Sequence, residues 1–223
     1  MRGKRSYDDG CAGAHALDLI GERWALLVAR ELLLGPKRFS DLRAGLPGIS
    51  ANVLSQRLDE LERAAVVRRH KLGPPSGAWV YELTEWGRQL EVVIVELGRW
   101  GARSPTLPRE APRSAVSTML SLRTLFDRDA ARGMTATVEL RFGVEAYHAT
   151  VADGAIAVAR GAAKAPDVVV EASPEALAAL VYDGASLAAA QKAGDVRVAG
   201  DKALLKRFLR LFAPPAPAGA AGA

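Results

Sequence analysis

The sequence predicts two domains: a mostly α-helical domain that carries a two-stranded hairpin, and then an α+β domain with a small, mostly antiparallel sheet. Three observations support this division. Apolar residues recur at helical spacing through most of residues 14–102, apart from one pair of short extended runs. From residue 135 to 171, apolar and polar residues alternate instead, which is typical of strands. Between these regions, residues 104–112 contain three prolines, which end helices because proline lacks a backbone donor.

The domain boundaries follow from this change of composition. We expect a first domain over 11–104, a Pro-rich linker over 105–113 and a second domain over 114–212. A chain of 223 residues is long enough for two such domains. The remaining segment, 213–223, contains only alanine, proline and glycine, so it can bury too little apolar surface to offset its ordering entropy. We expect this tail to be disordered.

Two short helices with a tight turn between them are expected in the middle of the first domain. Ser40 can cap a helix over 41–44, which ends in the Gly/Pro-containing turn 45–48. Ser50 then stands before residues 51–65, whose apolar side chains recur at helical spacing. A pair of helices joined in this way is typical of a helix-turn-helix, whose second helix can enter the major groove of DNA.

Further helices and a hairpin flank this pair. The loop 73–77 reads Gly-Pro-Pro-Ser-Gly and separates two short extended runs, which predicts a hairpin. The hairpin would be the two-stranded wing of a winged helix-turn-helix. The expected flanking elements are helices over 14–21, 24–34 and 84–102, and strands over 66–72 and 78–83.

The charge distribution favours a polyanionic partner. The formal net charge is +5, and the basic excess is concentrated between Lys37 and Lys71. In the major groove Asn and Gln can pair with adenine and Arg with guanine, whereas other basic and polar side chains bind phosphates. The alternative is a polar helix face that is merely solvated. We expect base reading by Ser50, Asn52, Ser55, Gln56 and Arg57, and contacts to the DNA backbone by Arg38, Ser40, Arg68 and Lys71.

Four stretches of the first domain, in order, resemble the HxlR family of winged-helix regulators. They are residues 11–24, LLLGPKRFSDL at 32–42, PGISANVLSQRLDELE at 47–62 and YELTEWGR at 81–88. The resemblance implies a homodimer joined through the first and last helices, which binds a palindromic double-stranded DNA operator. It implies a transcriptional regulator, with repression as the expected sign. The residues expected at the dimer interface are Leu17, Ile20, Leu90, Val93, Ile94 and Leu97.

Cys11 is the single cysteine of the chain, so no internal disulfide is expected. Some HxlR members sense electrophiles or oxidants through a cysteine at the matching position, which makes Cys11 a candidate redox thiol. The sequence departs from the family pattern, because Ala12-Gly13 replaces the common Cys-Pro and no second cysteine can act as a partner. A packed, inert thiol is the alternative. His15 lies four residues away, but two ligands are too few for a metal site.

The second domain is predicted to be α+β. A helix is expected over 115–127, followed by four extended segments that form an antiparallel sheet, with Asp153-Gly154 as a hairpin turn. Ser173-Pro-Glu has the form of a helix start. The expected strands lie near 135–142, 145–151, 155–160, 167–171 and 196–198, and the expected later helices over 174–182, 184–193 and 201–212.

Residues 114–212 resemble the sterol carrier protein fold, chiefly in 167–177 and in the stretch from Gly184 to Leu204. Such domains hold apolar ligands between a curved sheet and its helices, so the resemblance implies a small apolar effector as a partner. The alternatives are that the apolar residues form only the core of a small domain, or that the domain serves dimerisation. The candidate lining residues are Val138, Leu140, Phe142, Leu177, Leu180, Leu205, Phe208 and Phe212.

The sequence offers no catalytic residues. It has no glycine-rich phosphate loop, HExxH motif or nucleophile elbow, and its three histidines and single cysteine are scattered. We therefore expect no enzyme activity, no metal and no cofactor. Apolar runs fall short of the roughly 20 residues that a membrane helix needs, so we expect no membrane partner and a cytoplasmic protein.

Two functional hypotheses follow from these observations. The leading one is a dimeric operator-binding regulator whose second domain binds an apolar effector or reinforces the dimer. The alternative is a lipid or hydrophobic-ligand binding protein whose winged helix mediates protein interaction. Binding to specific DNA that weakens steeply with salt would distinguish the first from the second.

Overall fold

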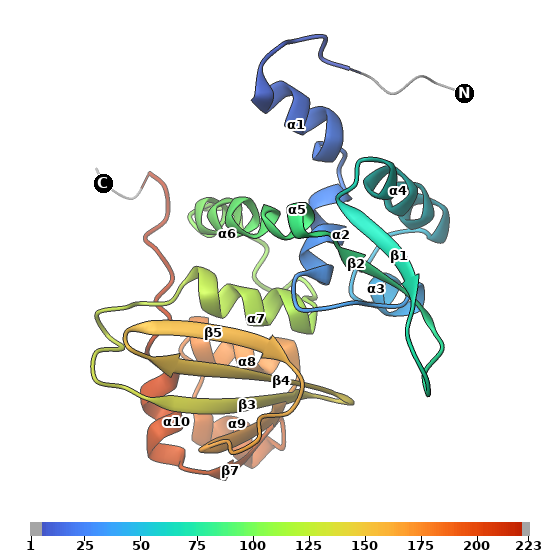
Figure 1. Ribbon diagram of the computed structural model, residues 1–223. Coiled ribbons are helices and arrows are strands. Elements are labelled where there is room, and N and C mark those ends of the chain that lie inside the picture. Colours follow the sequence, from blue (N-terminus) through green and yellow to red (C-terminus); the bar gives the residue numbers. More distant parts are fainter. Residues whose placement is uncertain (1–5, 220–223) are drawn as a thin grey trace. The chain divides into compact units, whose positions relative to one another are not determined.

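The chain divides into two compact units, Met1–Ile94 and Val95–Ala223, in a computed structural model that describes residues 6–219 (Figure 1). The division falls within the helix Leu90–Gly101, earlier in the chain than the predicted linker. Residues 102–114 contain no helix or strand, and the predicted linker 105–113 lies inside that stretch. The domain boundary at residue 104 stays a prediction.

The first unit is a winged helix-turn-helix, as predicted. Ser50 caps the second helix of the pair, because its Oγ accepts a hydrogen bond from Val53 N at 3.3 Å. The hairpin is antiparallel, with Lys71 opposite Trp79 next to the loop. The elements are α1 (Ala12–Ile20), α2 (Ala25–Leu32), α3 (Phe39–Ala44), α4 (Ala51–Arg63), β1 (Val67–Lys71), β2 (Trp79–Leu83), α5 (Glu85–Arg88) and α6 (Leu90–Gly101), which begins in this unit.

Helix α3 begins earlier than predicted. The sequence suggested Ser40 as the cap of a helix over 41–44, but the helix starts at Phe39 and Arg38 is its N-cap. The physical reason is the side chain of Asp41, whose Oδ2 accepts a hydrogen bond from Arg38 N at 3.3 Å. A carboxylate in the first turn therefore satisfies a backbone donor that precedes the helix.

The single helix predicted over 84–102 is two helices, α5 and α6. Thr84 caps α5, with Gly87 N donating to Thr84 Oγ1 at 2.9 Å. The chain then tightens, because Gln89 N donates to Trp86 O three residues back instead of following the i→i−4 pattern. The apolar periodicity continues across this turn, so periodicity alone could not show the break.

Helix α2 is the centre of the core of the first unit. Its residues Val28 and Ala29 are fully buried, as are Leu54 and Leu58 of α4. α2 contacts both α4 and β2. The segment that follows α2 is joined to β2 by a single antiparallel β-bridge: Lys37 N donates to Tyr81 O at 3.0 Å, and Tyr81 N to Lys37 O at 2.8 Å.

The second unit contains a mixed five-stranded sheet in the order β5-β4-β3-β6-β7. Three of its pairings are antiparallel, but β6 is parallel to β3. The sheet is thus mostly antiparallel, as predicted, but the expectation that its first four strands are all antiparallel was wrong for β6, which pairs in parallel with a strand distant in sequence. The last predicted strand, β7, joins the same sheet. The elements are α7 (Ala115–Thr124), β3 (Ala136–Phe142), β4 (Glu145–Ala152), β5 (Ala155–Arg160), β6 (Val168–Ala172), α8 (Pro174–Tyr182), α9 (Leu187–Ala193), β7 (Val196–Gly200) and α10 (Lys202–Leu209).

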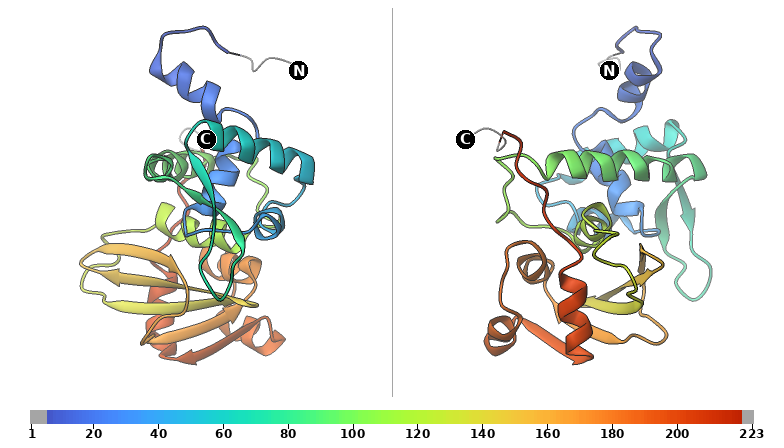
Figure 2. Two further views of the ribbon diagram at one scale, coloured as in Figure 1. Left: turned by 45° about the vertical axis from the view of Figure 1, so that its right-hand side comes forward. Right: turned by 90° about the vertical axis from the view of Figure 1, so that its left-hand side faces the viewer.

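Helices α8, α9 and α10 lie on one side of this sheet, as the orange and red ribbons of Figure 2 show. Helix α10 contacts β3 and β6, and Leu205 and Phe208 of α10 are fully buried. Alternate residues of β3, Val138 and Leu140, are fully buried as well. The interior of the second unit is therefore formed between the helices and the sheet.

The predicted disordered tail, 213–223, extends beyond the part of the chain that the structure describes, because residues 220–223 lie outside it. Up to residue 219 the tail has neither helix nor strand. Ala218 N donates a hydrogen bond to Arg103 O at 2.7 Å, within the second unit. Among residues 6–219, none of the helices is long and apolar enough to cross a membrane.

Candidate nucleic-acid interface

The N-terminal half of α4 presents most of the predicted base-reading residues to solvent. Leu54, Leu58 and Leu61 are buried against the core, so the other side of the helix faces outward. Gln56 lies on this outer side, where its Nε2 donates to Glu60 Oε1 at 3.0 Å and the amide is held along the helix. The predicted base-reading residues found exposed are Ser50, Asn52, Ser55 and Gln56.

Arg57 is placed differently from the other predicted base readers. It is 8% exposed, and its Nη1 lies 2.6 Å from Glu60 Oε2 and 3.5 Å from Glu22 Oε2. Position 57 is three residues after Leu54 and four before Leu61, so it shares the buried side of α4. The structure does not bring its guanidinium together with the exposed polar side chains.

The N-terminus of α3 lies beside the wing. Arg38 is exposed, and its Nη2 donates to Ser76 Oγ of the hairpin loop at 3.4 Å. Ser40 is also exposed, with its Oγ donating to Asp41 Oδ1 at 3.1 Å. These two predicted backbone-contacting residues therefore share one edge of the first unit with the wing loop.

On the wing, Arg68 is paired across the hairpin. Its Nη2 and Nε donate to Glu82 Oε2 at 2.7 and 3.1 Å. These hydrogen bonds hold the pKa of the Glu82 carboxyl below its usual range. Lys71 is exposed, so it and Arg38 are better placed than Arg68 to meet a phosphate.

Arg69 is a wing residue that the sequence reasoning did not select. Its guanidinium carbon lies 4.7 Å from the ring centre of Trp79 and 5.9 Å from that of Tyr81. Arg69 pairs with Tyr81 in the hairpin register, and Lys71 with Trp79, so alternate residues share this face. The sequence could predict this stacking only if the register of the hairpin were already known, because the register decides which side chains share a face.

The six predicted dimer residues fall into two groups. Ile20 is buried, and Leu90 and Ile94 pack against the core of the first unit. In contrast Leu17, Val93 and Leu97 are exposed by 51%, 47% and 49%. The exposed group leaves apolar side chains of α1 and α6 open to solvent, together with Val92 and Trp100 of α6.

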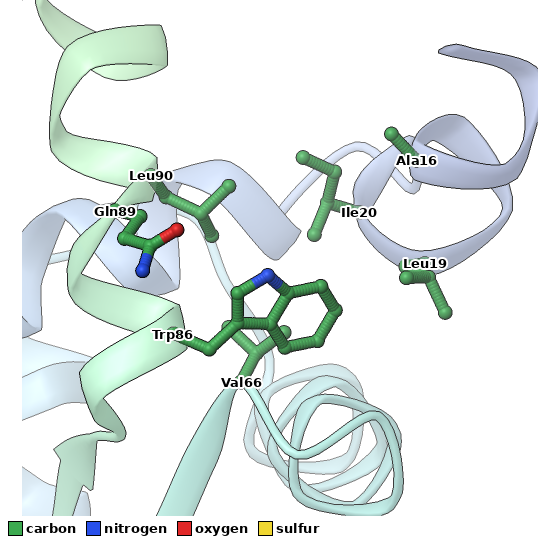
Figure 3. A pocket seen from close by; sticks show the side chains of 7 residues that line it. All are labelled: Ala16, Leu19, Ile20, Val66, Trp86, Gln89 and Leu90. Carbon is green, nitrogen blue, oxygen red and sulfur yellow. The ribbon is translucent and has the colours of Figure 1, made fainter. Parts of the chain in front are cut away.

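A groove of about 200 Å³ lies between α1 and the start of α6 in the first unit. Figure 3 shows Ile20 of α1 on the side of the ring of Trp86 that faces α1, with Val66 and Leu90 close to the ring. Most of the lining side chains are apolar. Ile20 and Leu90 are thus directed into their own unit, which explains why they are less exposed than Leu17 and Val93.

Cys11 is exposed at the N-cap of α1. Hydrogen bonds from the backbone N–H groups of Ala14 and Gly13 lower the pKa of its thiol. The structure thus gives Cys11 an accessible position rather than a packed one. In the described part of the chain, no group of three or more His, Cys, Asp or Glu side chains could hold a metal ion.

The eight candidate ligand-lining residues of the second unit are all buried, with at most 8% of any one exposed. They belong to the interior between the sheet and its helices. Phe208 and Phe212 form an edge-to-face pair with ring centres 5.0 Å apart. This packing is typical of a hydrophobic core. That these residues line a ligand pocket stays a prediction.

Two protein families match different parts of the chain. Residues 19–107 match the HxlR-like helix-turn-helix family, and residues 104–218 match the alkyl sulfatase C-terminal family. The second match differs from the predicted sterol carrier protein-like assignment, which therefore stays a prediction. The two matched ranges overlap at residues 104–107.

The relatives of the first unit are bacterial. The chain is 39% identical over 85 residues to the uncharacterized HTH-type transcriptional regulator YvaP of Bacillus subtilis, covering 38% of this chain and 79% of that protein. It is 39% identical over 85 residues to the HTH-type transcriptional regulator YodB of the same organism, covering 38% and 76%. A solved structure of the reduced form of YodB aligns with a TM-score of 0.39 at 35% identity, covering 43% of this chain and 95% of that one.

Both relatives are named as HTH-type transcriptional regulators. The chain belongs to the HxlR family of DNA-binding helix-turn-helix transcriptional regulators, with a second unit of the alkyl sulfatase C-terminal family.

Proposed function

We propose that this regulator binds a palindromic operator as a homodimer and represses the promoter beside it. The exposed N-terminal half of α4 is the observation that supports this most directly. Asn52 and Gln56 carry amides that can pair with adenine, and both lie on the outer side of a helix whose inner side is buried. Such a helix can enter the major groove while its core contacts stay intact.

We also propose that exposed residues outside α4 contact the phosphates of the DNA backbone. Arg38 and Lys71 are exposed, and Ser40 can add a hydroxyl contact beside Arg38. Arg68 can take part only if its guanidinium shares its hydrogen bonds with Glu82. We propose that Arg57 supports α4 through Glu60 instead of contacting a base.

The homodimer is proposed to form through the exposed apolar side chains of α1 and α6. Leu17, Val93 and Leu97 are large apolar residues about half exposed, and exposed apolar side chains on helices are candidates for contacts between copies. A twofold dimer presents two α4 helices related by symmetry, so its operator should be palindromic.

DNA binding tests this proposal directly. Labelled duplex from upstream of the gene is compared with a shuffled duplex of the same composition by fluorescence anisotropy, between about 50 and 200 mM salt. We expect preference for the upstream duplex, and an affinity that falls steeply with salt. Asn52→Ala should reduce the preference, whereas Gln89→Ala, an exposed amide outside α4, should not. Equal binding to both duplexes by the wild type would overturn the proposal.

For the second unit we propose binding of a molecule that carries an alkyl chain, as the effector. The support is the match over residues 104–218 to a domain of alkyl sulfatases, together with an interior built from apolar side chains. Native mass spectrometry of the purified protein tests this. A bound mass that denaturation releases supports the effector. A ligand-free protein that also leaves a fluorescent fatty acid unbound would contradict it.

A further inference from the structure

A buried ion pair lies beneath the proposed DNA-binding surface. Lys37 Nζ is 2.8 Å from Glu31 Oε2, and the two side chains are 4% and 0% exposed. Arg30 Nη2 lies 2.9 Å from the other carboxylate oxygen of Glu31. Lys37 belongs to the basic run from which the sequence predicted DNA contacts, yet its ammonium group is directed inward.

The pair connects three parts of the first unit. Glu31 is in the last turn of α2, and the backbone of Lys37 is hydrogen-bonded in both directions to Tyr81 of the wing strand β2. The carboxylate of Glu31 also lies against the end of α3, because a Cβ placed on Gly45 would be 2.5 Å from its Oε2. One carboxylate therefore lies between the wing attachment and the turn of the helix-turn-helix.

A buried ion pair is suited to fixing geometry. Replacing such a pair by apolar residues of similar volume often leaves stability unchanged or improves it, so stability alone does not account for the pair. Its hydrogen bonds are directional and strong in a low-dielectric interior, and they allow few arrangements of the groups that they join. Here those groups are the end of α2, the end of α3 and the start of the wing.

We propose that Glu31 and Lys37 are positioning residues for DNA binding. They fix the position of the wing relative to the turn before α4. The distance between the exposed Arg38 and Lys71 then matches the distance between the phosphates that they bind. Lys37 does not itself contact DNA. This proposal rests on the operator binding proposed above.

A salt titration separates positioning from contact. Lys37→Met and Lys71→Met are a matched pair, the same substitution at a buried and at an exposed lysine. Loss of one phosphate contact should flatten the slope of log K against log salt by about 0.9 in Lys71→Met. Lys37→Met should bind the upstream duplex about tenfold more weakly with its slope unchanged. A slope as flat as that of Lys71→Met would show direct contact and overturn the proposal.

A second variant guards against simple misfolding, because Lys37→Met leaves the Glu31 carboxylate buried with one partner fewer. In Glu31→Leu/Lys37→Met both charges are replaced by apolar groups, and the fold should persist by circular dichroism and thermal unfolding. We expect this double variant to bind the upstream duplex more weakly than the wild type, again at an unchanged salt slope. Wild-type affinity in a fully folded double variant would overturn the positioning role.

Hydrogen exchange without DNA keeps this test separate from that of operator binding. In the double variant, peptides over 79–83 should exchange faster than in the wild type, while peptides over 51–63 should be unchanged. Unchanged exchange over 79–83 would overturn the proposal even if operator binding is confirmed. If the wild type fails to prefer the operator, the proposed function fails, and the exchange result still shows whether the pair holds the wing.

Discussion

Arg57 is expected to stabilise α4 without reading a base. Its guanidinium is bonded to Glu60 on the buried side of the helix. We expect Arg57→Met to lower the free energy of unfolding by about 1–2 kcal/mol, because charged hydrogen bonds are lost while the apolar stem is kept. Urea unfolding measures this change, and competition binding measures the ratio of operator to random-DNA affinity. That ratio should stay near the wild-type value.

Asn52→Ala is the matched control for Arg57, since Asn52 lies on the exposed side of the same helix. It should leave stability nearly unchanged and reduce the preference for the operator. If Arg57→Met lost as much preference as Asn52→Ala, Arg57 would have to reach a base edge despite its burial.

The Cys11 thiol should react as a thiolate at a lower pH than an ordinary cysteine. Backbone N–H groups of Ala14 and Gly13 lower its pKa. Ala14→Pro removes the first of these donors in the first turn of α1, where proline is tolerated. We expect the pH midpoint of iodoacetamide alkylation, followed by mass spectrometry, to rise in this variant. The denatured wild type supplies the reference, and equal midpoints in all three samples would contradict the prediction.

The pairing of Glu82 with Arg68 should make the free energy of unfolding depend on pH. The folded-state pKa of Glu82 is lowered by hydrogen bonds from Arg68. The stabilisation is therefore present above the unfolded-state pKa of about 4.3 and is lost as the pH falls through the lower folded-state value. Since both groups are partly exposed, Glu82→Gln should cost about 0.5–1 kcal/mol near pH 7.

Urea unfolding at several pH values measures this dependence. The stability difference between wild type and Glu82→Gln should shrink as the pH falls below about 4. The variant also releases Arg68, so its affinity for DNA should rise at neutral pH with a steeper salt slope. A stability difference that is constant with pH would count against the pairing.

At the scale of elements, the sequence predicted α4 and the wing well, and for clear physical reasons. Ser50 is a strong N-cap before a regular apolar stripe, and glycines and prolines occupy the wing loop 73–77. The same stripe explains why Asn52 and Gln56 were correctly expected on the outer side of α4. Arg57 lies beside this stripe and is buried, which its basic chemistry alone does not indicate.

Features that depend on tertiary contacts escaped prediction. The pairing of Arg68 with Glu82 requires the hairpin register, which the loop sequence alone does not fix. The close approach of Gly87 of α5 to Val66, just before β1, is also a tertiary contact. A Cβ on Gly87 would be 2.0 Å from Val66 O.

Gly87 should therefore not tolerate a side chain. Gly87→Ala forces α5 away from Val66 O, and we expect a loss of about 2–3 kcal/mol in the free energy of unfolding. Gly101 is the matched control, because a Cβ there meets nothing within 4 Å. Gly101→Ala should be neutral or stabilising by up to about 1 kcal/mol, since alanine favours the helix. Thermal unfolding measures both variants, and equal effects would refute the role of close packing at Gly87.

For the whole molecule, the change in sequence pattern after residue 104 predicted a second domain, but not how its sheet is arranged. Alternation in 135–171 identified the strands, because it depends only on neighbouring residues. The parallel pairing of β6 with β3 joins segments separated by β4 and β5. No local pattern encodes that partner, so the mixed sheet could be found only from the structure.

The proposed palindromic operator requires that two copies of the chain form a dimer. Val93 lies on α6 and is 47% exposed, so Val93→Glu should place a charge in the proposed interface without disturbing the core. A buried unpaired charge opposes association, so light scattering after gel filtration should show a monomer. Palindromic duplex should then bind much more weakly, whereas a single half-site should bind as before. Val144→Glu, on the fully exposed tip of a hairpin in the second unit, should leave a dimer. A dimeric Val93→Glu protein with full operator affinity would exclude this face of α6 as the contact between copies.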